Sequence, residues 1–305
     1  MSAEVSVLFD APGPRARLRH NVIAIVGGLA IAVLLFLLVR ALAAKGQFTA
    51  AKWSPFLEPA TWTAYLLPGL RGTLVAAFFS IILAIVFGIL LGMGRLSQLS
   101  GVRWACGIFV EFFRAVPVLM MMLFAYYVFL FGFQISGSLL SLYGVIAGLT
   151  FYNSSVIAEL IRSGVGALPN GQREAGLSLG LTPFQTLRMV LLPQAITLML
   201  PSIVSQMVVI LKDSALGFLI LYEELVRAGQ TLASARGNLI PTFIVIAAIF
   251  IVINYLLTLL ARYLERRLQT ARRGPKAPPA DPMLNPALAP AIGATEAPAE
   301  GSRAA

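Results

Sequence analysis

Long apolar runs, mostly free of charged residues, alternate with short polar segments along most of this chain. About 20 consecutive apolar residues in a helix are enough to cross the hydrocarbon core of a bilayer. The pattern therefore predicts an all-α polytopic membrane protein with about six transmembrane helices. The expected spans are residues 22–39, 72–94, 105–132, 139–162, 189–211 and 239–261.

The first apolar run superficially resembles a secretory signal peptide, because Arg15, Arg17 and Arg19 precede it. The run is about twice the length of a typical signal core, and no small-residue cleavage site follows it. We therefore favour a retained additional membrane helix at 21–42, behind a cytoplasmic segment at 1–20, over a cleaved signal. Residues 43–65 contain two tryptophans and two prolines, which is typical of an interfacial loop with aromatic anchors.

Composition strengthens the membrane assignment. The 305 residues are 58% hydrophobic and 12% charged, and the mean hydropathy is +0.85, values that exclude a soluble globular protein. A single cysteine, Cys106, excludes an intrachain disulfide, and a single histidine, His20, leaves no cluster for a transition metal. The net charge of +10 comes from basic residues at the ends of apolar runs, which indicates orientation in a membrane rather than nucleic-acid binding.

The distribution of lysine and arginine predicts that orientation. With the N-terminus in the cytoplasm, the cytoplasmic segments hold thirteen basic residues and the outer segments six. The six are Arg40, Lys45, Lys52, Arg71, Arg227 and Arg236. This asymmetry follows the positive-inside rule and predicts a multi-pass plasma-membrane protein with both termini cytoplasmic. Residues 274–305 contain seven prolines and lack periodicity, so we expect a disordered cytoplasmic tail.

One polar segment, residues 169–193, interrupts the apolar pattern and would lie in the cytoplasm. Its turn chemistry predicts two short helices with a tight bend between them. Asn170 can cap the first helix, and Gly180 can end it in the left-handed conformation. Thr182 and Gln185 form the pattern of a capping box for the second helix.

The spacing of residues in this hairpin closely resembles the EAA loop of ATP-binding-cassette importer permeases. The residues that carry the resemblance are Glu174, Ala175, Gly176, Gly180, Leu192 and Pro193. The resemblance implies that the hairpin couples the membrane domain to an ATPase subunit. We interpret the small residues at 175 and 176 as positions where another protein approaches the backbone closely. Gly176 and Val190 depart conservatively from the family pattern, and an ordinary amphipathic loop helix is the alternative.

Four further stretches look like permeases for polar amino acids, in the branch that carries histidine, glutamine and glutamate. They are residues 69–74, 111–117, 158–164 and 211–216. The resemblance implies a type I importer transmembrane domain at 66–267. Family members usually have five spans, so the first helix here is additional. The sequence around Lys212 and the proline-rich tail are most similar to actinobacterial glutamate permeases.

Ionisable residues within membrane spans are costly, so each is a functional candidate. Glu111 and Arg114 are three residues apart, as are Glu159 and Arg162, so each pair can form a local ion pair or serve a function. Lys212-Asp213-Ser214 differs, because it interrupts a span that Pro193 and Pro201 should kink.

Both charges of an amino acid need complements when water is removed, and Lys212 and Asp213 could supply them. The alternative is a self-neutralising pair at the outer end of the span. The candidate residues of the substrate path are Lys212, Asp213, Ser214, Glu159 and Asn153.

These observations predict a transport subunit and not an enzyme. The chain contains no G-x-x-x-x-G-K-[ST] loop, so it should hold no cofactor, and ATP should be used by a partner. The resemblance implies cytoplasmic ATPase subunits, a second permease subunit, identical or not, and an extracytoplasmic binding protein that delivers a polar amino acid such as glutamate or glutamine. The rival hypothesis is a secondary transporter that uses Glu111, Glu159 and Asp213 as an ion relay.

Overall fold

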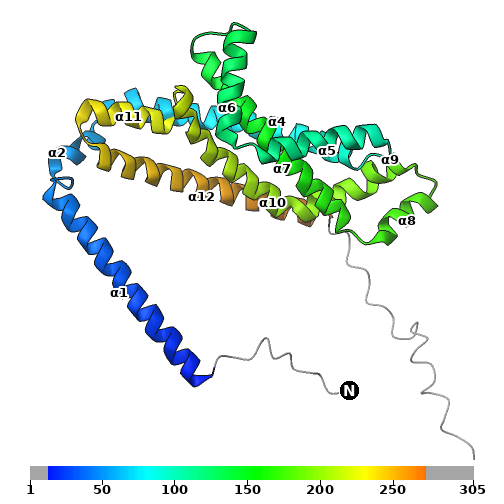
Figure 1. Ribbon diagram of the computed structural model, residues 1–305, viewed down its shortest axis with the longest axis horizontal. Helices are drawn as coiled ribbons and strands as arrows, with labels where there is room; N and C mark the ends of the chain where they lie inside the picture. The colour runs from blue at the N-terminus through cyan, green and yellow to red at the C-terminus, as the bar shows by residue number, and fades with distance from the viewer. Residues whose placement is uncertain (1–12, 273–305) are drawn as a thin grey trace, which may run out of the picture. The chain divides into compact units, whose positions relative to one another are not determined.

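The computed structural model describes residues 13–272, and all regular elements assigned in this range are helical. The α-helices in Figure 1 are α1 (Pro14–Ala44), α2 (Ala50–Trp53), α3 (Pro59–Thr61), α4 (Leu67–Arg95), α5 (Ser100–Ala115), α6 (Val118–Tyr127), α7 (Ser138–Gly166), α8 (Asn170–Ser178), α9 (Pro183–Thr186), α10 (Leu192–Asp213), α11 (Leu225–Arg236) and α12 (Leu239–Arg272). Short 3₁₀ segments occur at Ser54–Leu57 and Ser214–Ile220, and π-helical segments occur at Trp62–Leu66, Val128–Gly132 and Leu187–Leu191.

Five of the six predicted spans are confirmed as helices long and apolar enough to cross a membrane. They are Arg15–Ala44, Pro59–Arg95, Ser138–Gly166, Pro183–Ile220 and Leu239–Tyr263. The third predicted span, at 105–132, is broken in the structure, because α5 and α6 meet at an angle of 105°. Val116 is extended there, with φ −85° and ψ 131°, since the ring of Pro117 disfavours a helical residue before it. The segment 1–12 and the tail 274–305 lie outside the described residues.

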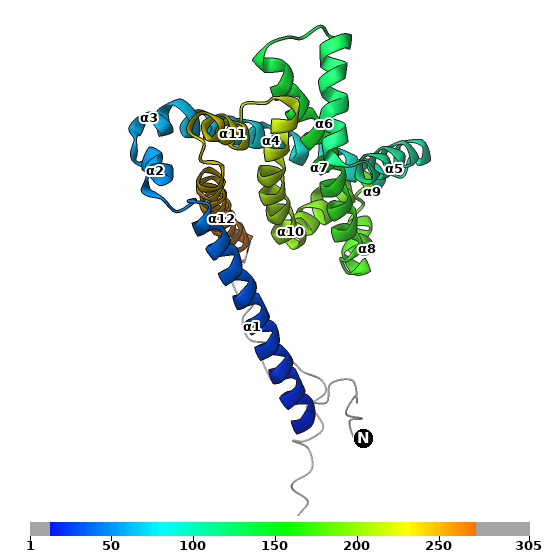
Figure 2. The same cartoon turned by 60° about the vertical axis from the view of Figure 1, so that its left-hand side comes forward.

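Helix α7 is the centre of the bundle. It packs against α4, α5, α6 and α10, as the turned view in Figure 2 illustrates. The main core contains Met122, Leu149, Ile157 and Ile161, all almost completely buried. At Gly148 a Cβ atom would lie 2.7 Å from the backbone nitrogen of Met122, so a glycine is required for the contact between α6 and α7.

A second core lies between the residues before α4, α11 and the start of α12. Its buried members are Leu66, Leu225, Leu232 and Ile246. The sequence pattern did not reveal α11 as a separate helix. The segment before α3 is tied to the turn between α11 and α12, because the Lys52 ammonium donates to the Gly237 carbonyl at 3.2 Å. Arg236 also forms an ion pair with Glu58 at 2.7 Å.

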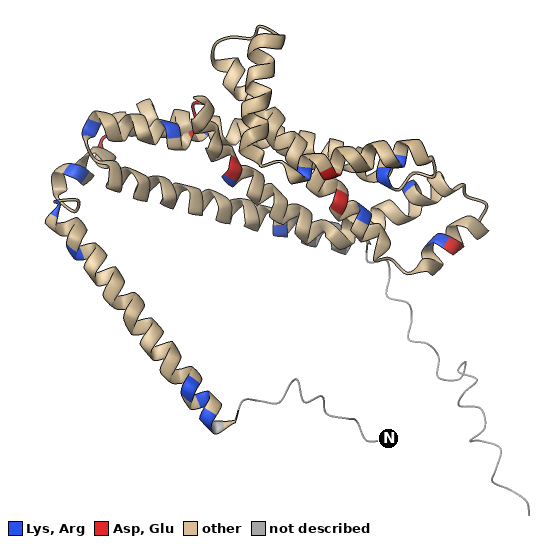
Figure 3. Ribbon diagram, in the orientation of Figure 1, with Lys and Arg blue, Asp and Glu red and all other residues tan. Residues whose placement is uncertain are grey.

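Helix α1 has no buried side chain from Arg15 to Ala44. Its charged residues lie toward its two ends, and the stretch between them is uncharged (Figure 3). Residues up to Arg262 belong to one compact unit, and Tyr263 begins a second unit, of which the structure describes the end of α12. The uniform exposure of α1 is what a helix surrounded by lipid requires.

Candidate functional site

The hairpin at 169–193 contains the turn that the sequence predicts. Gly180 has a φ of +78°, as predicted. The N–H of Leu181 donates to the carbonyl of Gly176, and the N–H of Gly180 donates to that of Leu177, which together form a Schellman motif. The capping box of Thr182 and Gln185 is also confirmed. The bend is therefore fixed by local hydrogen bonds.

Three details of the predicted hairpin are wrong. Asn170 is the first helical residue and not the cap, a position held by Pro169 without a side-chain hydrogen bond. The second arm is not a separate short helix, because helical structure runs from Pro183 into α10. Gly176 is buried, and a Cβ there would lie 2.6 Å from the Thr186 methyl group, so its small size serves packing within the hairpin.

The predicted coupling residues divide into an exposed and an inner set. Glu174, Ala175 and Gly180 are exposed. Leu192 is buried in the main core, and Pro193 is half-buried beside it. Two apolar side chains that the sequence analysis overlooked, Leu179 and Phe184, are 81% and 58% exposed. The hairpin therefore presents exposed apolar side chains together with charges of both signs, from Glu174, Arg173 and Arg188, while its base is anchored in the bundle.

A cluster of ion pairs joins the ends of α4, α5 and α7. The Glu159 carboxylate lies 2.7 Å from Arg95, 2.5 Å from Arg162 and 3.8 Å from Arg114. The predicted pair of Glu159 and Arg162 is confirmed. Glu111 instead pairs with Arg95 at 3.1 Å, so the predicted local pair of Glu111 and Arg114 is wrong. Arg95 of α4 pairs with both Glu111 and Glu159, so pairs between helices take the place of the local one.

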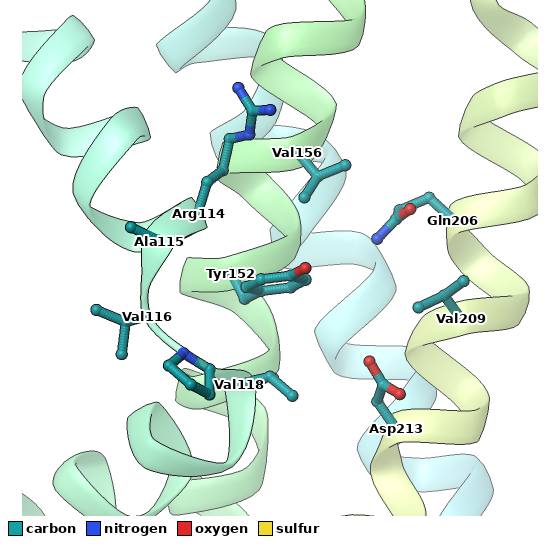
Figure 4. A pocket seen from close by; sticks show the side chains of 10 residues that line it. Arg114, Ala115, Val116, Val118, Tyr152, Val156, Gln206, Val209 and Asp213 are labelled. Carbon is teal, nitrogen blue, oxygen red and sulfur yellow. The ribbon is translucent and has the colours of Figure 1, made fainter.

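Arg114 also lines a cavity of about 330 Å³ at the break between α5 and α6, a volume at the lower end of small-molecule sites. Figure 4 shows Arg114 at one end and the Asp213 carboxylate at the other, with the Tyr152 ring between them and the Gln206 amide alongside. The N-terminus of α6 opens onto the same cavity at Pro117 and Val118. A helix N-terminus carries partial positive charge, so the cavity has one cationic and one anionic end.

The structure separates the remaining predicted path residues. Asn153 is fully buried and accepts a hydrogen bond from Gln206 at 2.6 Å, which places it behind the cavity wall. Ser214 is also fully buried, and its hydroxyl donates to the Leu211 carbonyl at 2.7 Å. Lys212 lines a different cavity, between α10, α11 and α12. Lys212 and Asp213 therefore do not face a common site within one chain, contrary to the prediction.

A buried carboxylate, that of Glu224, caps the start of α11. The Glu224 carboxylate is fully buried and accepts hydrogen bonds from the N–H groups of Val226 and Arg227, at 2.8 and 2.6 Å. Burial raises the pKa of Glu224 to about 7, although these two hydrogen bonds partly oppose the shift. Next to it, the Tyr222 hydroxyl donates to the Gly72 carbonyl at 2.8 Å. These contacts fix the start of α11 against α4.

Sequence reasoning missed Arg95, Tyr152, Gln206 and Glu224. Gln206 offered a signal, because it is a polar residue within an apolar span. Arg95 and Glu224 lie at the ends of apolar runs, where charged residues are ordinary, so nothing local distinguished them. Among the described residues no group of three or more His, Cys, Asp and Glu side chains could hold a metal ion.

Comparison with known proteins identifies a family and individual relatives that this chain resembles. Residues 84–270 match the family model described as the binding-protein-dependent transport system inner membrane component. The chain is 50% identical over 226 residues to the glutamate transport system permease protein GluD of Corynebacterium glutamicum, which covers 74% of this chain and 83% of the relative.

Two further similarities agree with that match. The chain is 36% identical over 207 residues to the probable glutamine ABC transporter permease protein GlnP of Bacillus subtilis, covering 67% of this chain and 94% of the relative. The crystal structure of an amino acid ABC transporter with histidines matches with a TM-score of 0.62 and 29% identity, covering 70% of this chain and 98% of that chain. None of the three comparisons supports the rival secondary transporter.

Proposed function

Because the chain belongs to the family of binding-protein-dependent transport system inner membrane components, we propose that it carries glutamate into the cell. Members of this family are multi-pass permeases that work with ATPase subunits and a substrate-binding protein, and they are not enzymes themselves. The observation that carries the substrate assignment is the high identity to the Corynebacterium glutamate permease. Glutamine is the second candidate, because the Bacillus relative is named for it.

The cavity between α5, α7 and α10 is the proposed substrate site. A zwitterionic amino acid requires a cationic and an anionic partner when it leaves water. Arg114 and the N-terminus of α6 would bind the carboxylate, and Asp213 would bind the ammonium group. Two features support this assignment. Arg114 is held only loosely by Glu159, at 3.8 Å, and the Asp213 carboxylate forms no ion pair or side-chain hydrogen bond among the described residues.

The surface of Glu174, Ala175, Leu179, Gly180 and Phe184 is the proposed ATPase contact. These residues are exposed, while Leu192 at the base of the hairpin is packed into the main core. A displacement of the hairpin by the ATPase would therefore be transmitted to α10. Alternating access would then follow from nucleotide-driven motion of the ATPase. The chain itself would hold no nucleotide. Both termini and this hairpin would lie in the cytoplasm, and a second permease subunit would complete the pore.

Uptake of labelled glutamate by proteoliposomes that contain this permease, its ATPase and its binding protein tests the substrate assignment. We expect uptake to require ATP hydrolysis, to survive collapse of ion gradients, and to be inhibited more strongly by unlabelled glutamate than by glutamine or arginine. Asp213→Asn should abolish uptake, whereas Glu223→Gln, an exposed control, should not. Wild-type uptake by Asp213→Asn would exclude the cavity as the substrate site.

Gly180→Asp tests the coupling role of the hairpin. The substitution forces a side chain into a backbone conformation with φ +78°, but no core residue contacts the site. We expect normal membrane abundance with little uptake and poor recovery of the ATPase. Glu174→Ala should have a weaker effect, since an exposed charge contributes about 1 kcal/mol or less. Normal uptake and ATPase recovery in Gly180→Asp would reject the coupling role.

A further inference from the structure

The side-chain amide of Gln206 faces the proposed substrate site. Gln206 is half-buried on α10 and lines the cavity together with Tyr152 of α7 (Figure 4). An amide can present either its oxygen, which accepts hydrogen bonds, or its nitrogen, which donates them, and the neighbouring hydrogen bonds decide which. The two orientations would attract different groups of a substrate.

Asn153 of α7 fixes the orientation of this amide. The Asn153 side chain is fully buried, and its nitrogen donates to the Leu149 carbonyl at 2.7 Å. A backbone carbonyl can only accept, so the Asn153 oxygen is the atom left to face α10. There it accepts a hydrogen bond from the Gln206 nitrogen at 2.6 Å. Gln206 therefore keeps its oxygen for the cavity, and among the described residues that oxygen accepts no hydrogen bond.

The free oxygen lies on the same face of α10 as the Asp213 carboxylate. Gln206, Val209 and Asp213 follow the helical spacing i, i+3 and i+7, and all three line the cavity. This wall of the cavity thus offers two acceptors, whereas Arg114 and the N-terminus of α6 line it with positive charge. An ammonium group would find partners on α10, and a carboxylate would be repelled there.

We propose that Asn153 is a positioning residue, which makes Gln206 an acceptor for the ammonium group of the substrate. The inference rests on the proposed function and deepens it, because it names the group that α10 selects. Such a wall admits an amino acid and rejects a dicarboxylate of the same length without the ammonium group, since that compound leaves the acceptors unpaired. Asn153 acts through Gln206 and does not itself touch the substrate.

Competition binding to the purified transporter in lipid nanodiscs, without the binding protein, tests the proposal. The complex contains both permease subunits and the ATPase, so the selectivity measured is that of the membrane site. The probe is labelled glutamate, and the competitor is glutarate, which is glutamate without its ammonium group. The readout is the selectivity ratio, the inhibition constant of glutarate divided by the Kd of glutamate.

Gln206→Met should lower the selectivity ratio about tenfold or more, because a hydrogen bond to a charged group is lost. Asn153→Leu should also lower it, since the Gln206 amide can then turn its nitrogen toward the cavity. Asn153→Asp keeps an acceptor for that nitrogen and should hold the ratio near wild type. Ser155→Ala is the matched control, because Ser155 is fully buried on the same helix and its hydroxyl donates to the Phe151 carbonyl at 3.0 Å. Its ratio should be unchanged.

A double-mutant comparison separates positioning from a general effect on folding. In a Gln206→Met background, Asn153→Leu should change the selectivity ratio no further, because the residue through which it acts is gone. A further fall of the same size would overturn the positioning role. If Asn153→Leu fails to accumulate, Gln206→Met and Asn153→Asp still test the inference.

The outcomes separate this inference from the proposed function. A wild-type complex that binds glutamate, with the same selectivity ratio in Gln206→Met, would overturn the inference and leave the glutamate assignment intact. A wild-type complex that binds no glutamate would count against the proposed function itself, and the inference would fall with it.

Discussion

Helices α1 and α7 are similar in length but opposite in packing. The most apolar 18-residue window of α1 has a mean hydropathy of 3.2 and no buried residue, whereas that of α7 has a mean hydropathy of 1.4 and is 61% buried. The more hydrophobic helix is thus the one whose window has no residue buried among the described residues. In a bilayer this is physically reasonable, because lipid tails are as apolar as leucine and give apolar helices no reason to associate.

The residues of α7 explain why it packs. Its buried positions include glycines, serines and an amide, which permit close contact between helices and hydrogen bonds within the bundle. They include Gly144, Gly148, Asn153, Ser154, Ser155 and Gly164. The uncharged stretch of α1 is mostly Leu, Ile and Val, and although it contains Gly27 and Gly28 its one polar side chain in residues 21–39 is Asn21. Hydropathy therefore predicts which segments enter the membrane, and polar residues within them indicate which segments form the core.

The largest expected effect comes from a large side chain at a tight contact of α7. In Gly148→Leu the new Cβ would lie 2.7 to 2.8 Å from backbone atoms of Met122. Overpacking of a core usually costs about 1–3 kcal/mol and more where backbone must move. We expect loss of most folded permease, measured by size-exclusion chromatography in detergent. The matched substitution Gly28→Leu in α1, where a Cβ would meet nothing within 4 Å, should leave the profile unchanged.

The second prediction concerns a buried group outside the spans, Glu224. Its pKa is about 7 in the folded protein, compared with an ordinary value of 4.5. The folded state therefore binds a proton that the unfolded state has released, and stability should fall as the pH rises from 4.5 through 7. The shift corresponds to a free energy of unfolding of about 3 kcal/mol at most.

Glu224→Gln should abolish this pH dependence, because the amide can still accept hydrogen bonds from the start of α11 but cannot ionise. The measurement is the thermal unfolding midpoint in detergent between pH 4.5 and 8. Glu174→Gln serves as the control, since Glu174 is exposed, whereas the charge of Glu223 itself helps to raise the pKa of Glu224. An unchanged slope in Glu224→Gln would mean that another group titrates.

The third prediction compares two carboxylates of the ion-pair cluster. Glu159 is 21% exposed and pairs with three arginines, whereas Glu111 is 64% exposed and pairs with one. Glu159→Gln should lower the free energy of unfolding by roughly 1–3 kcal/mol, between the values for exposed and buried pairs. Glu111→Gln should cost less than about 1 kcal/mol. Equal losses in the two variants would contradict a central role for Glu159.

Sequence reasoning succeeded where the determinants are local. The turn at Gly180, the capping box at Thr182 and the pair of Glu159 and Arg162 each depend on residues within a few positions of one another. The bend between α5 and α6 could also have been predicted from the sequence, because Pro117 interrupts the expected span. The apolar residues on both sides made one long span the simpler interpretation.

The remaining features depend on contacts that sequence patterns do not contain. The cavity combines residues from α5, α7 and α10. The cluster brings Arg95 to Glu159, 64 positions away. Lys212 and Asp213 are neighbours in sequence but line different cavities, since helix geometry directs successive side chains to different faces. Which charge faces which cavity is fixed only when α5, α7 and α12 are in place.

The smallest expected effect is that of removing α1 itself. A chain that begins at Lys45 loses little packing within the described residues, because no side chain from 15 to 44 is buried there. It keeps the contacts that fix the following segment to the bundle, through Lys52 with Gly237 and Glu58 with Arg236. We expect the unfolding midpoint in detergent and the rate of glutamate uptake to match those of the full chain.

Substituting Lys52→Ala in the shortened chain should lower the midpoint slightly, since it removes a partly exposed hydrogen bond worth about 1 kcal/mol. A large drop from loss of α1 alone would show that this helix packs against another subunit of the transporter.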